Sequence, residues 1–259
     1  MRACIFVDGE NLRHTICDLF EPDFDRREYL PKSADWASFY DHVVGTATKG
    51  LGTRLRTYWY VVENVDPYPS LPKKQEQGAA GLDAWATKNE KLVREFQLPA
   101  NGDERRKAIS TIVGDAYQKR NTIKSRFDGY TVLQNGITAK HRSIEFRRSG
   151  SISYNVLNGK FGQEKTVDVN LAVDMVTLHA NYDVGIIVSG DQDYVPAAQT
   201  VKDMGKHVVN VAFKARNGVL LPGGAKRLNQ ATDWSVELEF DEFKRFLNIA
   251  PRAPQAGNP

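Results

Sequence analysis

The last third of the chain alternates helix-like and strand-like segments, and this alternation constrains the fold more than any other feature. A helix is predicted from about Asp168 to Ala180, a strand at Val184–Ser189, a helix from about Tyr194 to Met204, and a strand at Val208–Phe213. Helices that join successive strands in this way favour a parallel sheet with right-handed crossovers. We therefore expect an α/β fold with a mainly parallel central sheet flanked by helices.

The N-terminal region contributes further elements to this sheet. Arg2–Asp8 is a short apolar run followed by Gly9, a pattern typical of strands that are buried on both faces. A helix is expected from about Asn11 to Phe20. Apolar residues at helical spacing predict a second helix around Trp36–Val44, and β-branched and aromatic residues predict a strand at Thr53–Val62. Together these segments define an expected core of residues 1–62 and 160–249.

The middle of the chain, residues 63–159, has a different character and is the expected insertion. Clustered prolines open it, and a charged helix-favouring stretch continues to about Arg126. Short strands are predicted at Tyr130–Leu133, Arg142–Phe146 and Ser151–Val156, the last two joined by a hairpin turn at Arg147–Gly150. The proline-rich tail, residues 250–259, is expected to be disordered.

Basic residues are concentrated in one segment. The chain carries a net charge of +3, whereas residues 101–150 hold eleven Lys or Arg against five Asp or Glu, so that this segment is +6 and the remainder −3. Such a segment, interleaved with aromatic rings, fits a face that binds single-stranded nucleic acid, although a solvated charged surface is the simpler alternative. The candidate nucleic-acid-binding residues are Lys119, Arg120, Lys124, Arg126, Lys140, Arg142, Arg147 and Arg148.

Several protein classes do not fit the sequence. The longest apolar runs are far shorter than the roughly 20 residues needed to span a bilayer. The chain reaches Asp8 and Gly9 before a signal-peptide apolar region could form, so we expect a cytoplasmic protein. The two cysteines, Cys4 and Cys17, lack the spacing of a zinc or redox motif and are expected to be reduced and structural.

Acidic residues follow two of the predicted strands. One strand runs into Asp8, and another runs into Asp191 and Asp193. In a parallel sheet the carboxyl ends of the strands share one edge, and the first turn of the intervening helix, with Asp168, should lie at the same edge. Taken singly, each acid has a structural alternative as a turn residue or helix cap. Their convergence from three regions favours a functional cluster.

Carboxylates that lie a few ångströms apart repel one another unless a cation compensates or protons are taken up. Mg²⁺ and Mn²⁺ prefer oxygen ligands, and no His/Cys constellation here indicates zinc. A metal held in this way can activate water and stabilise the charge that develops on a phosphodiester. The cluster therefore indicates a nuclease whose cofactor is Mg²⁺ or Mn²⁺.

Three segments resemble the signature of NYN domains of the LabA-like group: Ile5–Asn11, Lys165–Asp174 and Val188–Pro196, the last followed by Gly205-Lys-His-Val. A fourth segment, Leu220–Trp234, is similar to the family's closing segment but departs from it slightly at Asn229–Asp233. The resemblance covers about residues 1–62 and 160–240 and leaves the middle segment unmatched. Substrate choice is therefore expected to depend on the middle segment.

The resemblance implies a PIN-like Rossmannoid fold and a site for one or two Mg²⁺ or Mn²⁺ ions. It puts Asp8, Asp168, Asp191 and Asp193 in the metal cluster, with Asn11 orienting a ligand or phosphate and Asp174 as a supporting, possible metal ligand. The expected activity is hydrolysis of RNA rather than DNA, with no membrane partner and a homodimer as an open alternative. Two other functions stay open: a non-catalytic RNA- or protein-binding module with a structural metal site, and a phosphohydrolase acting on small nucleotides. The phosphohydrolase is disfavoured because no GxxxxGK-type phosphate loop occurs.

Overall fold

The computed structural model describes residues 1–100 and 102–250, so the expected disorder of the C-terminal tail falls almost wholly outside the described residues. The chain divides into two compact units. The first comprises Met1–Val61, Val132–Ser149 and the chain from Thr166 onward, and the second comprises Val62–Thr131 and Gly150–Lys165. Residues 132–149, which we expected in the insertion, thus belong to the first unit.

A mainly parallel sheet forms the centre of the first unit. Strand β1 (Arg2–Asp8) lies between β2 (Thr53–Tyr68) and β5 (Val184–Val188) and is parallel to both. Strand β6 (His207–Lys214) pairs in parallel with β5 and with β8 (Trp234–Leu238), and the two-residue β7 (Leu220–Leu221) pairs with it antiparallel. The expected α/β fold with a mainly parallel central sheet is confirmed.

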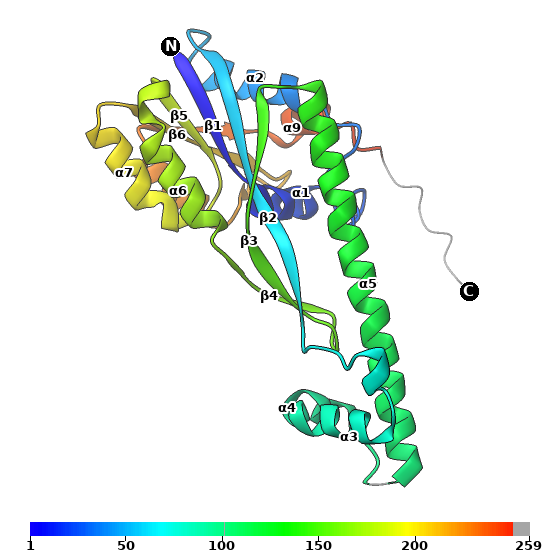
Figure 1. Cartoon of the computed structure of the whole chain (residues 1–259). Helices are drawn as coiled ribbons and strands as arrows, with labels where there is room; N and C mark the ends of the chain where they lie inside the picture. Colours follow the sequence, from blue (N-terminus) through cyan, green and yellow to red (C-terminus); the bar gives the residue numbers. More distant parts are fainter. Residues whose placement is uncertain (101, 251–259) are drawn as a thin grey trace. The chain divides into compact units, whose positions relative to one another are not determined.

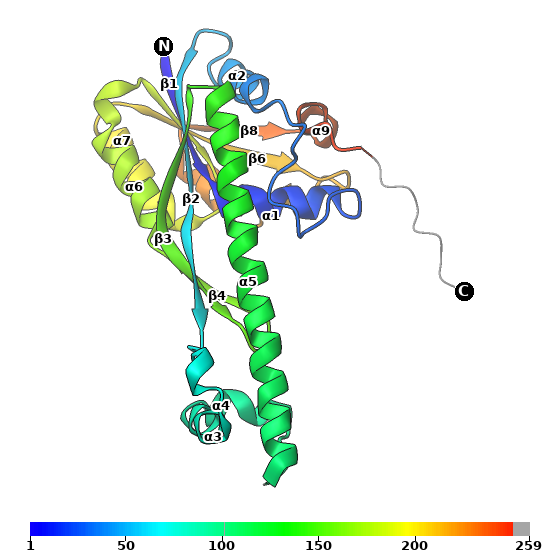
Figure 2. The ribbon, with the colours of Figure 1, turned by 45° about the vertical axis from the view of Figure 1, so that its right-hand side comes forward.

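Helices cover both faces of this sheet, which explains why its strands β1 and β5 are largely apolar. Figures 1 and 2 show α6 (Val167–Thr177) and α7 (Val195–Asp203) on one side and α1 (Gly9–Phe20), α2 (Trp36–Ala47) and α9 (Phe240–Leu247) on the other. All five residues of β5 are buried, and β1 is buried from its second residue onward. A strand covered on both faces gains from apolar side chains at every position rather than at alternate ones. The first unit also contains η3 (His179–Asn181), η4 (Gln192–Tyr194), α8 (Ala225–Ala231) and parts of α5 (Gly102–Lys140) and β3 (Ile144–Asn155).

The second unit has its own apolar core. Its elements are η1 (Lys74–Glu76), α3 (Ala79–Lys88), α4 (Glu90–Val93) and η2 (Arg94–Phe96), together with parts of β2, of α5 (Gly102–Lys140) and of β3 (Ile144–Asn155), and the strand β4 (Lys160–Lys165). Trp85, Ile109, Val113 and Val156 are among the buried residues of this core. The second unit therefore has a hydrophobic interior of its own.

One strand prediction and one turn prediction in the middle of the chain were wrong. Tyr130–Leu133 does not form a strand but lies within the 39-residue helix α5. Gln134 and Ile137, one helical turn apart, are both buried there, so packing along the helix prevails over the weak strand preference of four residues. Residues 142–146 and 151–156 are not joined by a hairpin turn, because β3 runs continuously through them from Ile144 to Asn155.

Candidate functional site

The ends of two neighbouring strands lie together. Val7 of β1 pairs with Val188 of β5 in parallel register, so Asp8 and the Ser189–Asp191 turn follow from adjacent positions at one sheet edge. Each turn leads into a helical element that is capped by an aspartate. The Asp8 carboxylate accepts from the backbone N–H of Asn11 at 3.0 Å, and the Asp191 carboxylate accepts from that of Asp193 at 2.9 Å. Local capping and sheet topology together thus place these acids.

Asp8 is almost fully enclosed, with 6% of its surface exposed. Besides the Asn11 N–H, it accepts from Ser189 Oγ at 3.0 Å and from the hydroxyl of Tyr194 at 3.3 Å, both at Oδ2. The pKa of Asp8 is raised to about 7, chiefly by burial and also by the charge of Asp168, whereas the three hydrogen bonds act in the opposite direction. The protein thus holds a buried carboxylate that carries a large cost of desolvation.

Tyr194 connects Asp8 to Asp168. Its hydroxyl lies 2.9 Å from Asp168 Oδ1 and 3.3 Å from Asp8 Oδ2, so one phenol contacts carboxylates from β1 and from α6. The pKa of Asp168 is raised, first by burial and then by the charges of Asp191 and Asp193. The four acids expected from the sequence therefore act on one another electrostatically, and we call Asp8, Asp168, Asp191 and Asp193 the rim cluster.

Close backbone packing holds the turn before Asp191. The N–H of Gly190 donates to Asn11 Oδ1 at 3.1 Å, which links this turn to α1. A Cβ on Gly190 would lie 2.3 Å from Pro222 Cγ, and one on Gly224 would lie 2.0 Å from the carbonyl oxygen of Gly190. Only glycine fits at either position, because the segment before α8 packs directly against the backbone of the turn before Asp191.

The donor set of the rim cluster fits a hard divalent cation in its chemistry, because all of its charged groups are carboxylates. Among the side chains that the structure describes, which exclude those of residues 101, 163–165 and 251–259, none of the four acids forms a salt bridge with a lysine or arginine. In the same part of the chain, no three His, Cys, Asp or Glu side chains already lie together in a way that could hold a metal ion.

Asp174 has different binding partners from the acids of the rim cluster. Its carboxylate accepts from the hydroxyl of Tyr60 at 2.8 Å and forms an ion pair with Arg147. Asn11, in contrast, is at the rim, where its side chain accepts from Gly190 and its backbone donates to Asp8. Asn11 thus contacts the rim cluster, whereas Asp174 is bound by Tyr60 and Arg147.

The eight candidate nucleic-acid-binding residues are divided between the two units. Lys119, Arg120, Lys124 and Arg126 belong to the second unit, and Lys140, Arg142, Arg147 and Arg148 belong to the first. Several are held by contacts within their own unit. Lys119 Nζ donates to the carbonyl of Leu157 at 2.6 Å, and Arg148 donates to Gln134 and Asn135 at 2.8 and 2.7 Å. Lys124, Lys140 and Arg142 are exposed.

Tyr194 is a site residue to which no pattern in the sequence pointed. It lies within the segment Val188–Pro196, which was singled out for its acids, but was assigned no role beyond the start of a helix. A tyrosine one residue after Asp193 could have been noticed as a hydroxyl donor beside carboxylates. Its contact with both Asp8 and Asp168, however, depends on how three elements pack.

No described helix is long and apolar enough to cross a membrane. A search of curated proteins found no match to the chain. Among solved structures, the chain is similar to a protein of unknown function from Vibrio parahaemolyticus, at 15% sequence identity over 91% of each chain and with a TM-score of 0.41. The family model of the NYN domain matches residues 2–233, which is most of the chain. The protein belongs to the NYN domain family, which is part of the PIN-like nuclease superfamily.

Proposed function

We propose that this NYN domain protein is a metal-dependent ribonuclease that hydrolyses phosphodiester bonds at the rim cluster. The observation that carries the proposal is the shared Tyr194 hydroxyl, which joins the carboxylates of Asp8 and Asp168. These acids come from elements about 160 residues apart in sequence, and burial raises the pKa of Asp8 to about 7. Structural capping alone does not require such a costly arrangement.

Mg²⁺ or Mn²⁺ would be held by Asp8 and Asp168 together with Asp191 or Asp193. When bound, it would lower the pKa of a water and stabilise charge on the phosphodiester. The chain's own residues would support this site: Ser189 and Asn11 fix the Asp8 carboxylate, and Tyr194 fixes that of Asp168.

Arg227 of α8 supplies a positive charge next to the rim cluster. Its guanidinium donates to the side chain of Gln192, between Asp191 and Asp193, at 2.6 Å. Arginine binds phosphate oxygens well, and an exposed guanidinium beside a carboxylate cluster is suited to hold a nucleic-acid backbone. RNA as the preferred substrate, and membership of the LabA-like group within the family, are parts of the same proposal.

The test is cleavage of end-labelled single-stranded RNA and DNA of one sequence, with Mg²⁺, with Mn²⁺ and with EDTA. We expect RNA to be cut only with metal, and we expect Asp8→Asn and Asp191→Asn to reduce cleavage to the EDTA level. The matched control is Asp203→Asn, at the far end of α7 about 12 Å along the helix axis from its start, which should cleave like the wild type.

Two outcomes would contradict the proposal. Wild-type protein that cuts no faster than Asp191→Asn with either metal would exclude catalysis at the rim cluster. Salt-dependent RNA binding that survives Asp8→Asn, with no turnover, would instead favour the non-catalytic binding module.

A further inference from the structure

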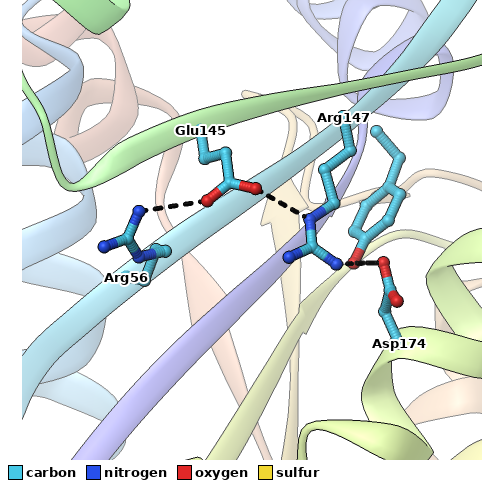
Figure 3. A network of polar contacts seen from close by, with 5 residues as sticks. Arg56, Glu145, Arg147 and Asp174 are labelled. Atoms are coloured by element: carbon cyan, nitrogen blue, oxygen red, sulfur yellow. Dashed lines mark hydrogen bonds and ion pairs between the residues drawn. The ribbon is translucent and has the colours of Figure 1, made fainter.

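Four charged side chains of the first unit form a connected network of hydrogen bonds and ion pairs. Arg56 of β2 donates to Glu145 of β3 at 3.0 Å, and Glu145 accepts from Arg147, two residues further along β3, at 3.1 Å. Arg147 in turn pairs with Asp174 of α6, as Figure 3 shows. The network therefore ties two strands to the helix that carries Asp168.

Arg147 and Asp174 are held from several sides. Both hydrogen bonds to Asp174, from Tyr60 and from Arg147, end on its Oδ2. The Arg147 guanidinium also lies over the ring of Tyr58, 4.1 Å from its centroid. The two side chains are only 27% and 24% exposed, so solvent screens their attraction less than that of a surface pair.

The position of Asp174 on α6 separates it from the rim cluster. It lies six residues after Asp168, which is about 9 Å along a helix axis. Asp168 is bound at the first turn of α6 by Tyr194, and Asp174 is bound at the last turn of the helix by Arg147 and Tyr60. The helix is therefore fixed at two points, one in the rim cluster and one outside it.

We propose that Asp174 is a positioning residue and not a metal ligand: paired with Arg147, it holds α6 so that Asp168 meets Tyr194 at the rim cluster. The assignment also makes Arg147 a part of this support rather than a nucleic-acid contact. Its consequence for activity rests on the proposed function, whereas its consequence for α6 does not.

Hydrogen exchange of the metal-free protein tests the support directly. Arg147→Met and Asp174→Asn should each speed amide exchange in α6 by about 5- to 30-fold, the factor that corresponds to losing one or two kcal/mol of local stability. The double variant should be no faster than either single variant, and Arg147→Lys should restore part of the protection. Exchange in β8, a strand without contacts to the pair, is the internal control. Unchanged exchange in α6, or additive effects of the two substitutions, would overturn the proposal.

Titration with Mn²⁺ alone separates a ligand from a positioning residue. Asp168→Asn should weaken Mn²⁺ binding by about 10-fold or more. Asp174→Asn should weaken it less than Asp168→Asn does and no more than Arg147→Met does, because both of these changes act only through the position of α6. Both of the latter should lower kcat for RNA cleavage with KM unchanged, and Arg147→Lys should recover part of it. Asp174→Asn that weakens Mn²⁺ binding as much as Asp168→Asn would overturn the proposal.

The two proposals fail in different ways. If the wild type neither binds Mn²⁺ nor cuts RNA, the proposed function is wrong, and the exchange experiment still decides whether Arg147 and Asp174 hold α6.

Discussion

Removing the hydroxyl of Tyr194 should destabilise the protein more than removing a comparable buried hydroxyl elsewhere. Tyr194 is fully buried, and its hydroxyl contacts the carboxylates of Asp168 and Asp8 at 2.9 and 3.3 Å. A hydrogen bond to a charged group contributes about 1.5–3 kcal/mol, against about 0.5–1.5 kcal/mol for a neutral pair. We therefore expect Tyr194→Phe to lower the free energy of unfolding by about 1.5–3 kcal/mol in EDTA.

Tyr182→Phe is the matched control for this change. Tyr182 is also fully buried in the first unit, but its hydroxyl donates to a neutral acceptor, the carbonyl of Met175, at 2.5 Å. Its removal should cost about 0.5–1.5 kcal/mol, measured by denaturant unfolding under the same conditions. A loss for Tyr194→Phe that is equal to or below the loss for Tyr182→Phe would refute the reasoning, because it would mean that neither Asp8 nor Asp168 carries charge at the shared hydroxyl.

Two further changes test the packing of the rim and the cap of α2. Gly224→Ala should destabilise the protein by about 1–3 kcal/mol, because the added Cβ would lie 2.0 Å from a backbone oxygen. The control is Gly223→Ala, where the added Cβ meets open space and the stability should equal that of the wild type. Equal stabilities of the two variants in denaturant unfolding would contradict this packing. Asp35→Ala removes the N-cap of α2 and should cost about 0.5–2 kcal/mol near neutral pH. Hydrogen bonds from Ser38 lower the pKa of Asp35 below 3.8, so this stabilisation is present above that pH and is lost as the pH falls through the lowered value. The deficit of Asp35→Ala should therefore shrink in acid, and a deficit that stays constant would show that the cap does not depend on charge.

The strands and helices that surround the rim could be predicted because their signals are local. Apolar runs at Arg2–Asp8 and Val184–Val188 indicate strands buried on both faces, and the alternation after residue 167 indicates parallel pairing. Parallel pairing places strand ends at one edge, which is why Asp8 and Asp191 could be expected near each other before any coordinates were known.

The middle of the chain could not be predicted in the same way. A four-residue run such as Tyr130–Leu133 is compatible with strand or helix, and only the buried neighbours along α5 decide between them. Arg147 and Arg148 were predicted to lie in a turn between two strands. Instead they lie within β3, where the side chain of Arg147 binds Asp174 and that of Arg148 binds Gln134. Successive side chains in a strand point to opposite faces, so which residues they meet depends on the elements packed on each face.

The sequence by itself thus determined the parallel α/β arrangement and the meeting of acids at one edge of the sheet. Only the tertiary structure decided how those acids are supported: Tyr194 joins Asp8 to Asp168, and Arg147 takes Asp174 away from them. The physical reason is one of range. Hydrophobic periodicity and capping depend on residues a few positions apart in the sequence. A hydrogen bond of about 3 Å between distant segments forms only when packing sets the positions of both segments within a fraction of an ångström.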